Sequence, residues 1–264
     1  MITRVSSIAF NTFREAVRDR VLYNLIVFAV LIVGSALLLG QISIDVERLF
    51  LINMGLTAIS LFGVVIAIFI GIGLVSKEIE KRTLYAILSR PVRRWEFILG
   101  KYFGLVGTLV VNAALMTAGF FAALLYLSKV SYPPYPFQSS DAYILVALYF
   151  ILLQFVLITS LSLLFSTFSS PLLSAVISFA LFIVGTFAED IRAAAIMAGG
   201  SMGLLLRVVA HLVPNLGSLN VVSSVAHGEA VSGALTLHNS LYVALYSAAV
   251  IFAAILIFER RNFK

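Results

Sequence analysis

The sequence contains no cysteine and little charge. Cysteine is absent from all 264 residues, which excludes disulfide bonds, thiolate nucleophiles, iron–sulfur clusters and cysteine-ligated zinc. Charged residues make up only 11% of the chain and hydrophobic residues 61%, whereas soluble domains are roughly 45 to 50% apolar. A soluble fold cannot bury so much apolar surface, so the composition indicates a membrane protein.

Several long stretches lack both charged residues and proline. About 20 apolar residues carry a helix across a bilayer, and a helix satisfies its own backbone hydrogen bonds at that depth. We therefore predict an all-α membrane protein with one transmembrane permease domain over residues 1–264. No cleavage site follows the first stretch, so we expect it to be retained as a helix. The six predicted spans are residues 21–40, 49–75, 102–127, 142–165, 172–188 and 240–258.

Lysine and arginine are distributed unevenly between the segments that join these spans. With the N-terminus inside, the cytoplasmic segments hold 14 of the 18 lysine and arginine residues. Cytoplasmic loops carry such an excess, so we predict an inner-membrane protein with both termini in the cytoplasm. The same bias explains the net charge of +6, and we expect no nucleic-acid partner.

Two segments outside the spans have helical patterns of their own. Residues 1–20 place apolar residues at helical spacing among arginines, which is typical of an amphipathic interfacial helix, although a simple positively charged anchor gives the same pattern. Within residues 189–239, the apolar stretch 193–206 is too short to cross a bilayer alone. We predict an interfacial or re-entrant helical segment there, on the outer side.

The predicted cytoplasmic loop, residues 76–101, carries the densest charge in the chain. One apolar stripe of a short helix runs through it, two glutamates near its start suit the helix dipole, and a proline should end it. Such a helix can dock into a groove of a partner protein, while the alternative is a basic loop that only maintains topology. The candidate coupling residues are Glu78, Ile79, Glu80, Thr83, Leu84, Ile87, Leu88, Pro91 and Arg94.

These loop residues also carry a family resemblance. The matching positions are Glu78, Thr83, Leu88, Pro91, Val92, Arg94, Gly100 and Lys101, with further matches at residues 212–216 and 258–263. With this pattern the chain resembles the ABC-2 family of ABC transporter permeases, and most of all the branch that includes the permease for nitrous-oxide reductase maturation. Family members frequently have glycine just before the threonine, where this chain has Arg82.

The resemblance implies a permease subunit that dimerises and rests on cytoplasmic ATPase subunits through its N-terminal helix and the loop at 76–101. It implies two ATPase copies, a second copy of this chain, membrane lipids and an extracytoplasmic accessory protein as partners. Gly100 and Lys101 do not form a phosphate-binding loop, because Trp95 occupies the position that requires glycine. We expect the partner to hydrolyse ATP, and we expect no cofactor. Export and force transmission to an outer partner are both open.

The segment 189–239 contains residues that also suggest two other activities, a serine hydrolase and a copper site. Gly199-Gly200-Ser201-Met202-Gly203 fits the Gly-x-Ser-x-Gly elbow of serine hydrolases, but the elbow follows a strand and residues 193–197 have a helical pattern. The alternative is that these small residues allow two helices to pack closely. Histidines could bind copper here, yet their spacing follows no ligand pattern, so we predict no metal site. The residues concerned are Asp190, Met197, Met202, His211, His227 and His238.

The predicted spans contain polar side chains but no charged ones. Proton and ion relays use intramembrane carboxylates or lysines, so their absence disfavours a proton-coupled transporter. We interpret most of the polar residues as hydrogen-bonding groups between helices. They are Asn53, Thr57, Asn112, Gln154, Thr159, Ser160, Ser162, Ser174 and Ser178.

Overall fold

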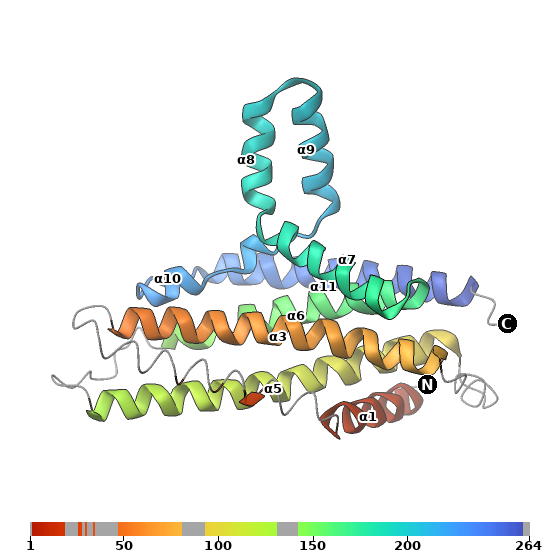
Figure 1. Ribbon diagram of the computed structural model, residues 1–264, viewed down its shortest axis with the longest axis horizontal. Coiled ribbons are helices and arrows are strands. Elements are labelled where there is room, and N and C mark those ends of the chain that lie inside the picture. Colours follow the sequence, from red (N-terminus) through yellow and green to blue (C-terminus); the bar gives the residue numbers. More distant parts are fainter. Residues whose placement is uncertain are drawn as a thin grey trace.

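The computed structural model describes residues 2–18, 47–80, 93–130 and 142–260, together with positions 26, 27, 30 and 34. Among these residues every regular element is a helix and no strand occurs, which confirms the predicted all-α class. Figure 1 shows the long helices running side by side in one bundle. The elements are α1 (Ile2–Arg18), α3 (Glu47–Glu80), α5 (Arg94–Val130), α6 (Ala142–Phe168), α7 (Pro171–Thr186), α8 (Ala188–Ala198), α9 (Gly200–Leu212), η2 (Gly217–Leu219), α10 (Val222–Ala226) and α11 (Gly233–Arg260).

The predicted number of six spans is not confirmed. Four helical segments are long and apolar enough to cross a membrane: Ile52–Gly73, Arg94–Ala122, Ala142–Phe168 and Gly233–Arg260. A fifth is reached if the bent pair α7 and α8 is taken as one span. The predicted first span, residues 21–40, lies almost entirely outside the described residues.

Helix α3 continues beyond the predicted end of the second span at residue 75 and reaches Glu80. No glycine or proline interrupts residues 76–80, and lysine and glutamate are good helix formers. Helix α5 starts at Arg94, well before the predicted start of the third span at residue 102. The carboxylate of Glu96 accepts a hydrogen bond from the Arg93 backbone N–H at 3.0 Å, which supports this start. Both ends of the predicted loop are therefore helical.

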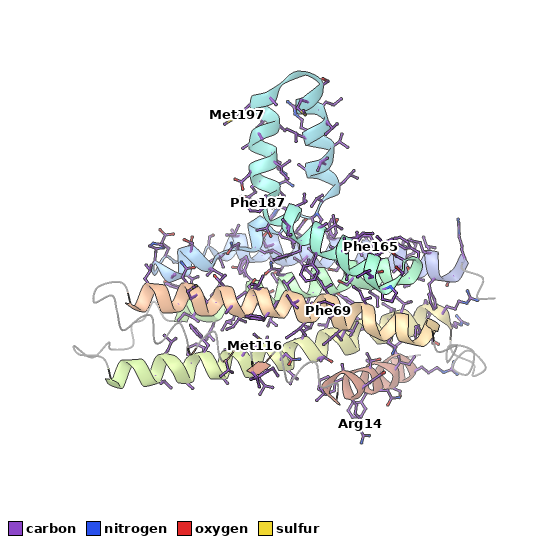
Figure 2. All side chains as sticks on the ribbon, in the orientation of Figure 1. Arg14, Phe69, Met116, Phe165, Phe187 and Met197 are labelled. Carbon is purple, nitrogen blue, oxygen red and sulfur yellow. The ribbon has the colours of Figure 1, made fainter. Side chains whose placement is uncertain are left out.

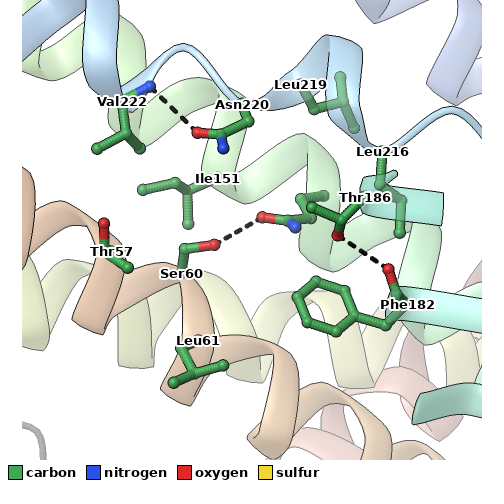
Figure 3. A pocket seen from close by; sticks show the side chains of 11 residues that line it. Thr57, Ser60, Leu61, Ile151, Phe182, Thr186, Leu216, Leu219, Asn220 and Val222 are labelled. Atoms are coloured by element: carbon green, nitrogen blue, oxygen red, sulfur yellow. Dashed lines mark hydrogen bonds between the residues drawn. The ribbon is translucent and has the colours of Figure 1, made fainter. Parts of the chain in front are cut away.

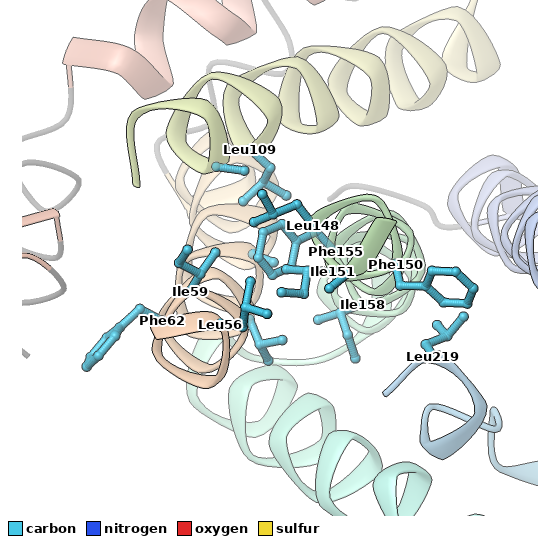
Figure 4. Packing of buried hydrophobic residues seen from close by; sticks show 14 of the residues in the cluster. Leu56, Ile59, Phe62, Leu109, Leu148, Phe150, Ile151, Phe155, Ile158 and Leu219 are labelled. Atoms are coloured by element: carbon cyan, nitrogen blue, oxygen red, sulfur yellow. The ribbon is translucent and has the colours of Figure 1, made fainter. Parts of the chain in front are cut away.

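The main core lies between α3 and α6. Gly63 faces the ring of Phe155 so closely that a Cβ atom would overlap it, and Gly55 faces Phe120 in the same way. Both phenylalanines are fully buried, and the small residues opposite them let the helices approach. Figure 4 shows Ile151 and Phe155 of α6 facing α3, with Leu109 of α5 beside them, while Phe62 points away from α6 and Phe150 points toward Leu219.

Helix α7 is shorter than the predicted fifth span, residues 172–188, and it does not continue straight. Its start is marked by Pro171 in the first turn and by the Ser170 hydroxyl, which accepts the Leu173 N–H at 3.4 Å. At its end the Leu216 N–H donates a hydrogen bond to the Gly185 carbonyl at 3.0 Å. Helix α8 then continues at an angle of 63° to α7. The bend lies beside this contact with a segment distant in sequence, and the hydropathy of residues 172–188 does not indicate it.

Helices α8 and α9 form an antiparallel hairpin that projects from the side of the bundle (Figure 1). Gly199 and Gly200 make its turn with φ angles of 58° and 53°, which favour glycine. A Cβ at Gly203 would lie 2.7 Å from the Ala195 carbonyl, so the two helices touch there. Met197 is 86% exposed near the tip (Figure 2). The predicted segment 189–239 thus begins as a helical hairpin, and its place relative to the membrane stays a prediction.

Candidate functional site

The amphipathic segment at the N-terminus forms helix α1, which lies against α5. Thr12 and Ala16 of α1 are each only 2% exposed, whereas Phe10 is 64% exposed on the opposite face. Cβ atoms built on Gly100 and Gly104 of α5 would lie 2.6 Å from the Ile8 side chain and 2.5 Å from the Ala9 carbonyl. Two glycines one helical turn apart therefore make the groove in which α1 rests.

A buried cation lies beneath α1. The Lys101 side chain is 4% exposed and its ammonium group lies 3.7 Å from the carboxylate of Glu15 on α1. The same ammonium lies 5.7 Å from the centre of the Phe97 ring. A buried charge is tolerated when it has an opposite charge or an aromatic face beside it, and Lys101 has both. Because the Glu15 side chain is 56% exposed, this ion pair adds only modestly to the packing contacts between α1 and α5.

The start of α5 is also attached to the end of α11. Arg94 donates hydrogen bonds from one guanidinium nitrogen to the backbone carbonyls of Phe258 and Glu259, at 3.1 and 2.9 Å. The rings of Phe97 and Phe258 stack with centroids 5.8 Å apart. We call these residues, with Glu15 and Lys101, the α1–α5–α11 cluster. It joins three helices at the end of the bundle where α3 also finishes (Figure 1).

Only part of the predicted coupling set falls within the described residues. Arg94 lies in the α1–α5–α11 cluster, while Glu78, Ile79 and Glu80 are the last residues of α3. The structure thus brings Arg94 to the same end of the bundle as the end of α3. Thr83, Leu84, Ile87, Leu88 and Pro91 lie outside the described residues, so the docking role of this set stays a prediction.

A pocket of about 170 Å³ lies between α3, α6, α7 and the segment 216–222, which includes η2 (Figure 3). None of its lining side chains is charged. Apolar side chains from all these elements make up the rest of the wall. Five lining residues are polar: Thr57, Ser60, Gln154, Thr186 and Asn220.

The polar groups of the pocket differ in how well they are satisfied. Ser60 donates to the Gln154 side-chain oxygen at 2.8 Å, which joins α3 to α6. The Thr186 hydroxyl donates to the Phe182 carbonyl at 2.9 Å, and the Asn220 side-chain oxygen accepts the Val222 N–H at 3.4 Å. Among the described residues, the nitrogen end of the Gln154 side chain makes no hydrogen bond, although Gln154 is only 9% exposed.

The sequence interpretation of the intramembrane polar residues was only partly correct. Gln154 does bond across helices, but Thr159 and Ser160 donate to carbonyls of their own helix, and Asn112 does the same. Hydroxyl groups in helices can bond to the carbonyl three or four residues earlier, which removes the need for a partner helix. The sequence alone does not indicate a role for Ser60, Thr186 and Asn220, because the pocket brings together residues that are distant in sequence.

The two alternative activities find no support in the structure. Ser201 is in the first turn of α9 and α8 precedes it, so the strand that a hydrolase elbow requires is absent from this described segment. Close packing at Gly203 explains the glycine instead. Among the described residues no group of three or more histidines and acidic residues is placed to hold a metal ion.

Comparison with known proteins gives one family. The family described as ABC-2 family transporter protein matches residues 6–263. No protein with a curated description matches the chain. The matched range includes most of α1 and the whole of α11, so it covers both the α1–α5–α11 cluster and the pocket.

Proposed function

Because the chain belongs to the ABC-2 family of transporter proteins, we propose that it is the permease subunit of an ATP-driven exporter. Permeases of this family generally work with cytoplasmic ABC ATPases. In this proposal a separate ATPase subunit binds and hydrolyses ATP, and this chain provides the path through the membrane. The observation that carries the proposal is the family match over residues 6–263.

The coupling region of the proposed permease is the end of the bundle that holds the α1–α5–α11 cluster. Helix α1 is held on α5 by the Gly100 and Gly104 contacts, and Arg94 connects α5 to the end of α11. A push on α1 or on the start of α5 would therefore move two long helices together. This supports docking of an ATPase through α1 and the segment 76–101. In this proposal the candidate coupling residues contact the ATPase.

The finer parts of the proposal concern assembly and orientation. Two copies of the chain pair with two ATPases in the inner membrane, and both termini face the cytoplasm. ATP binding draws the ATPases together, and their motion reorients α3 and α7 around a path at the dimer interface. The exported species serves metalloenzyme maturation, in keeping with the resemblance to that branch, and a periplasmic or extracytoplasmic accessory protein is a further partner.

A second proposal keeps the same complex but replaces export with force transmission to an outer partner. Helices α8 and α9 offer a surface for such a partner, because they form an arm that leaves the side of the bundle and exposes Met197 and Leu212. In sealed vesicles, export predicts ATP-dependent accumulation of a transported species. Force transmission predicts ATP hydrolysis without transport.

Substitutions in the loop test the docking role. Leu84→Asp and Leu88→Asp should abolish co-purification of the ATPase, because an unpaired charge in an apolar groove costs several kcal/mol. Glu78→Arg should weaken the association less. The measurement is co-purification of the ATPase, with ATP hydrolysis recorded on the same samples.

The matched control for Glu78→Arg is Glu229→Arg, which reverses a charge at an exposed position between α10 and α11. It should leave ATPase binding unchanged. Full binding and full coupled hydrolysis in all three loop variants would show that the loop only maintains topology.

A further inference from the structure

The pocket between α3, α6 and α7 has a composition that selects for neutral ligands. Of its eleven lining residues, five are polar without charge and six are apolar. Transfer of an ion to such a site is costly when no opposite charge or cluster of donors compensates it. An anion or a cation is therefore disfavoured.

The side chain of Gln154 indicates that a ligand of this pocket would form hydrogen bonds. One end of its carboxamide is paired with Ser60, and the other end makes no hydrogen bond within the described part of the chain. This holds whichever way the amide is turned, since a hydroxyl can bond either end. This end is not one of the fully buried unpaired atoms of the described residues, so it is accessible, and a polar group of a ligand that enters the pocket can bond to it.

The rest of the wall offers both polar and apolar contacts. Thr57 and Asn220 are exposed polar residues of the wall, on α3 and on the segment after η2. Phe182 and Ile151 provide apolar surface, as Figure 3 shows. A cavity of about 150 Å³ holds a benzene molecule, so the volume of about 170 Å³ admits a ligand with an aromatic ring or a body of similar size.

We propose that this pocket binds small neutral molecules that carry an amide, carbonyl or hydroxyl group on a compact apolar body, with Gln154 as the residue that recognises the polar group. If the bound molecule is the exported compound, the proposal names the class of substrate and rests on the proposed function. The binding of such molecules rests only on the pocket. Three helices and the segment 216–222 contribute to the wall, so a bound ligand contacts elements far apart in the sequence.

A matched series of three probes tests the proposal. Benzamide is neutral, benzoate is an anion and benzylammonium is a cation, while all three have nearly the same shape. Binding is measured by saturation-transfer NMR on the full chain in phospholipid nanodiscs, with empty nanodiscs as the blank. Benzamide should bind, and each charged analogue should bind at least about tenfold more weakly. Equal binding of the charged probes, or no binding of benzamide, would overturn the proposal.

Substitution of Gln154 separates recognition from filling of an apolar cavity. Gln154→Leu should raise the Kd for benzamide about three- to tenfold, as expected for the loss of one hydrogen bond. If the pocket only holds a lipid chain or another apolar group, this variant would bind benzamide as well as the parent or better. That result would also overturn the proposal.

Two further variants control for folding. Asn112→Leu removes a buried carboxamide on α5, outside the pocket, and should leave benzamide binding unchanged. Thr57→Val changes an exposed lining residue without loss of volume and should weaken binding about two- to fivefold, even if Gln154→Leu fails to fold. The assay contains no ATPase and no ATP, so its failure leaves the permease function standing, and loss of ATPase association leaves this binding result intact.

Discussion

Individual glycines control the contact between α1 and α5. A side chain at Gly100 or Gly104 would run into the Ile8 side chain or the Ala9 carbonyl, and a backbone carbonyl cannot move aside easily. Helix α5 also contains Gly119, where a Cβ would meet nothing within 4 Å. A glycine-to-alanine substitution can therefore be compared within α5 at Gly104, which has close neighbours, and at Gly119, which has none within 4 Å.

Gly104→Ala should destabilise the protein, because an inserted methyl group in a tight contact costs about 1 to 3 kcal/mol. Gly119→Ala should be neutral or stabilising by up to about 1 kcal/mol, since alanine favours the helix and no neighbour opposes it. The measurement is the midpoint of thermal unfolding of the purified chain in detergent. A lower midpoint for Gly119→Ala than for Gly104→Ala would contradict the contact.

At the scale of elements, the end of α11 depends on a residue from α5. The last carbonyls of a helix have no partner within the helix, and Arg94 provides one for Phe258 and Glu259. Charge-assisted hydrogen bonds of this kind are stronger than neutral ones. Helix α5 therefore stabilises the end of α11 as well as the position of α1.

Arg94→Met should let the end of α11 fray. Loss of about 1.4 kcal/mol would speed hydrogen exchange of the backbone amides in the last turn about tenfold, measured by mass spectrometry. Arg260→Met is the matched control, since Arg260 is an exposed basic residue in the last turn of α11. Equal exchange in the two variants would remove the role given to Arg94.

For the whole molecule, the absence of cysteine allows a direct test of orientation. Asn11 is exposed on α1, at one end of the bundle, and Glu229 is exposed beyond α10, at the other end (Figure 1). A single cysteine placed at either position is the only thiol in the chain. The two positions therefore report on the two sides of the membrane.

Asn11→Cys should react with a membrane-impermeant maleimide in inside-out vesicles only, and Glu229→Cys in right-side-out vesicles only, because basic segments stay in the cytoplasm. Detergent-opened membranes, in which both variants should react, provide the control. The reverse pattern would show that the predicted orientation is wrong.

The sequence by itself determined the class of the protein. An apolar share of 61% requires a membrane fold, and a membrane favours helices whatever their packing, so the all-α prediction was confirmed. The family resemblance was also confirmed at the level of ABC-2 transporters, while the coupling residues remain a prediction. Hydropathy is a property of one segment, so it predicts helices well, while the number of six spans stays a prediction.

The tertiary structure alone decided where these helices bend and what they enclose. The bend after α7 lies where Leu216 bonds to Gly185, and the hydropathy of residues 172–188 does not indicate it. The pocket arises because Ser60 meets Gln154, a residue 94 positions away in the chain. Contacts between distant segments depend on how helices pack, so the sequence pattern showed a polar residue in a span but not the pocket that it lines.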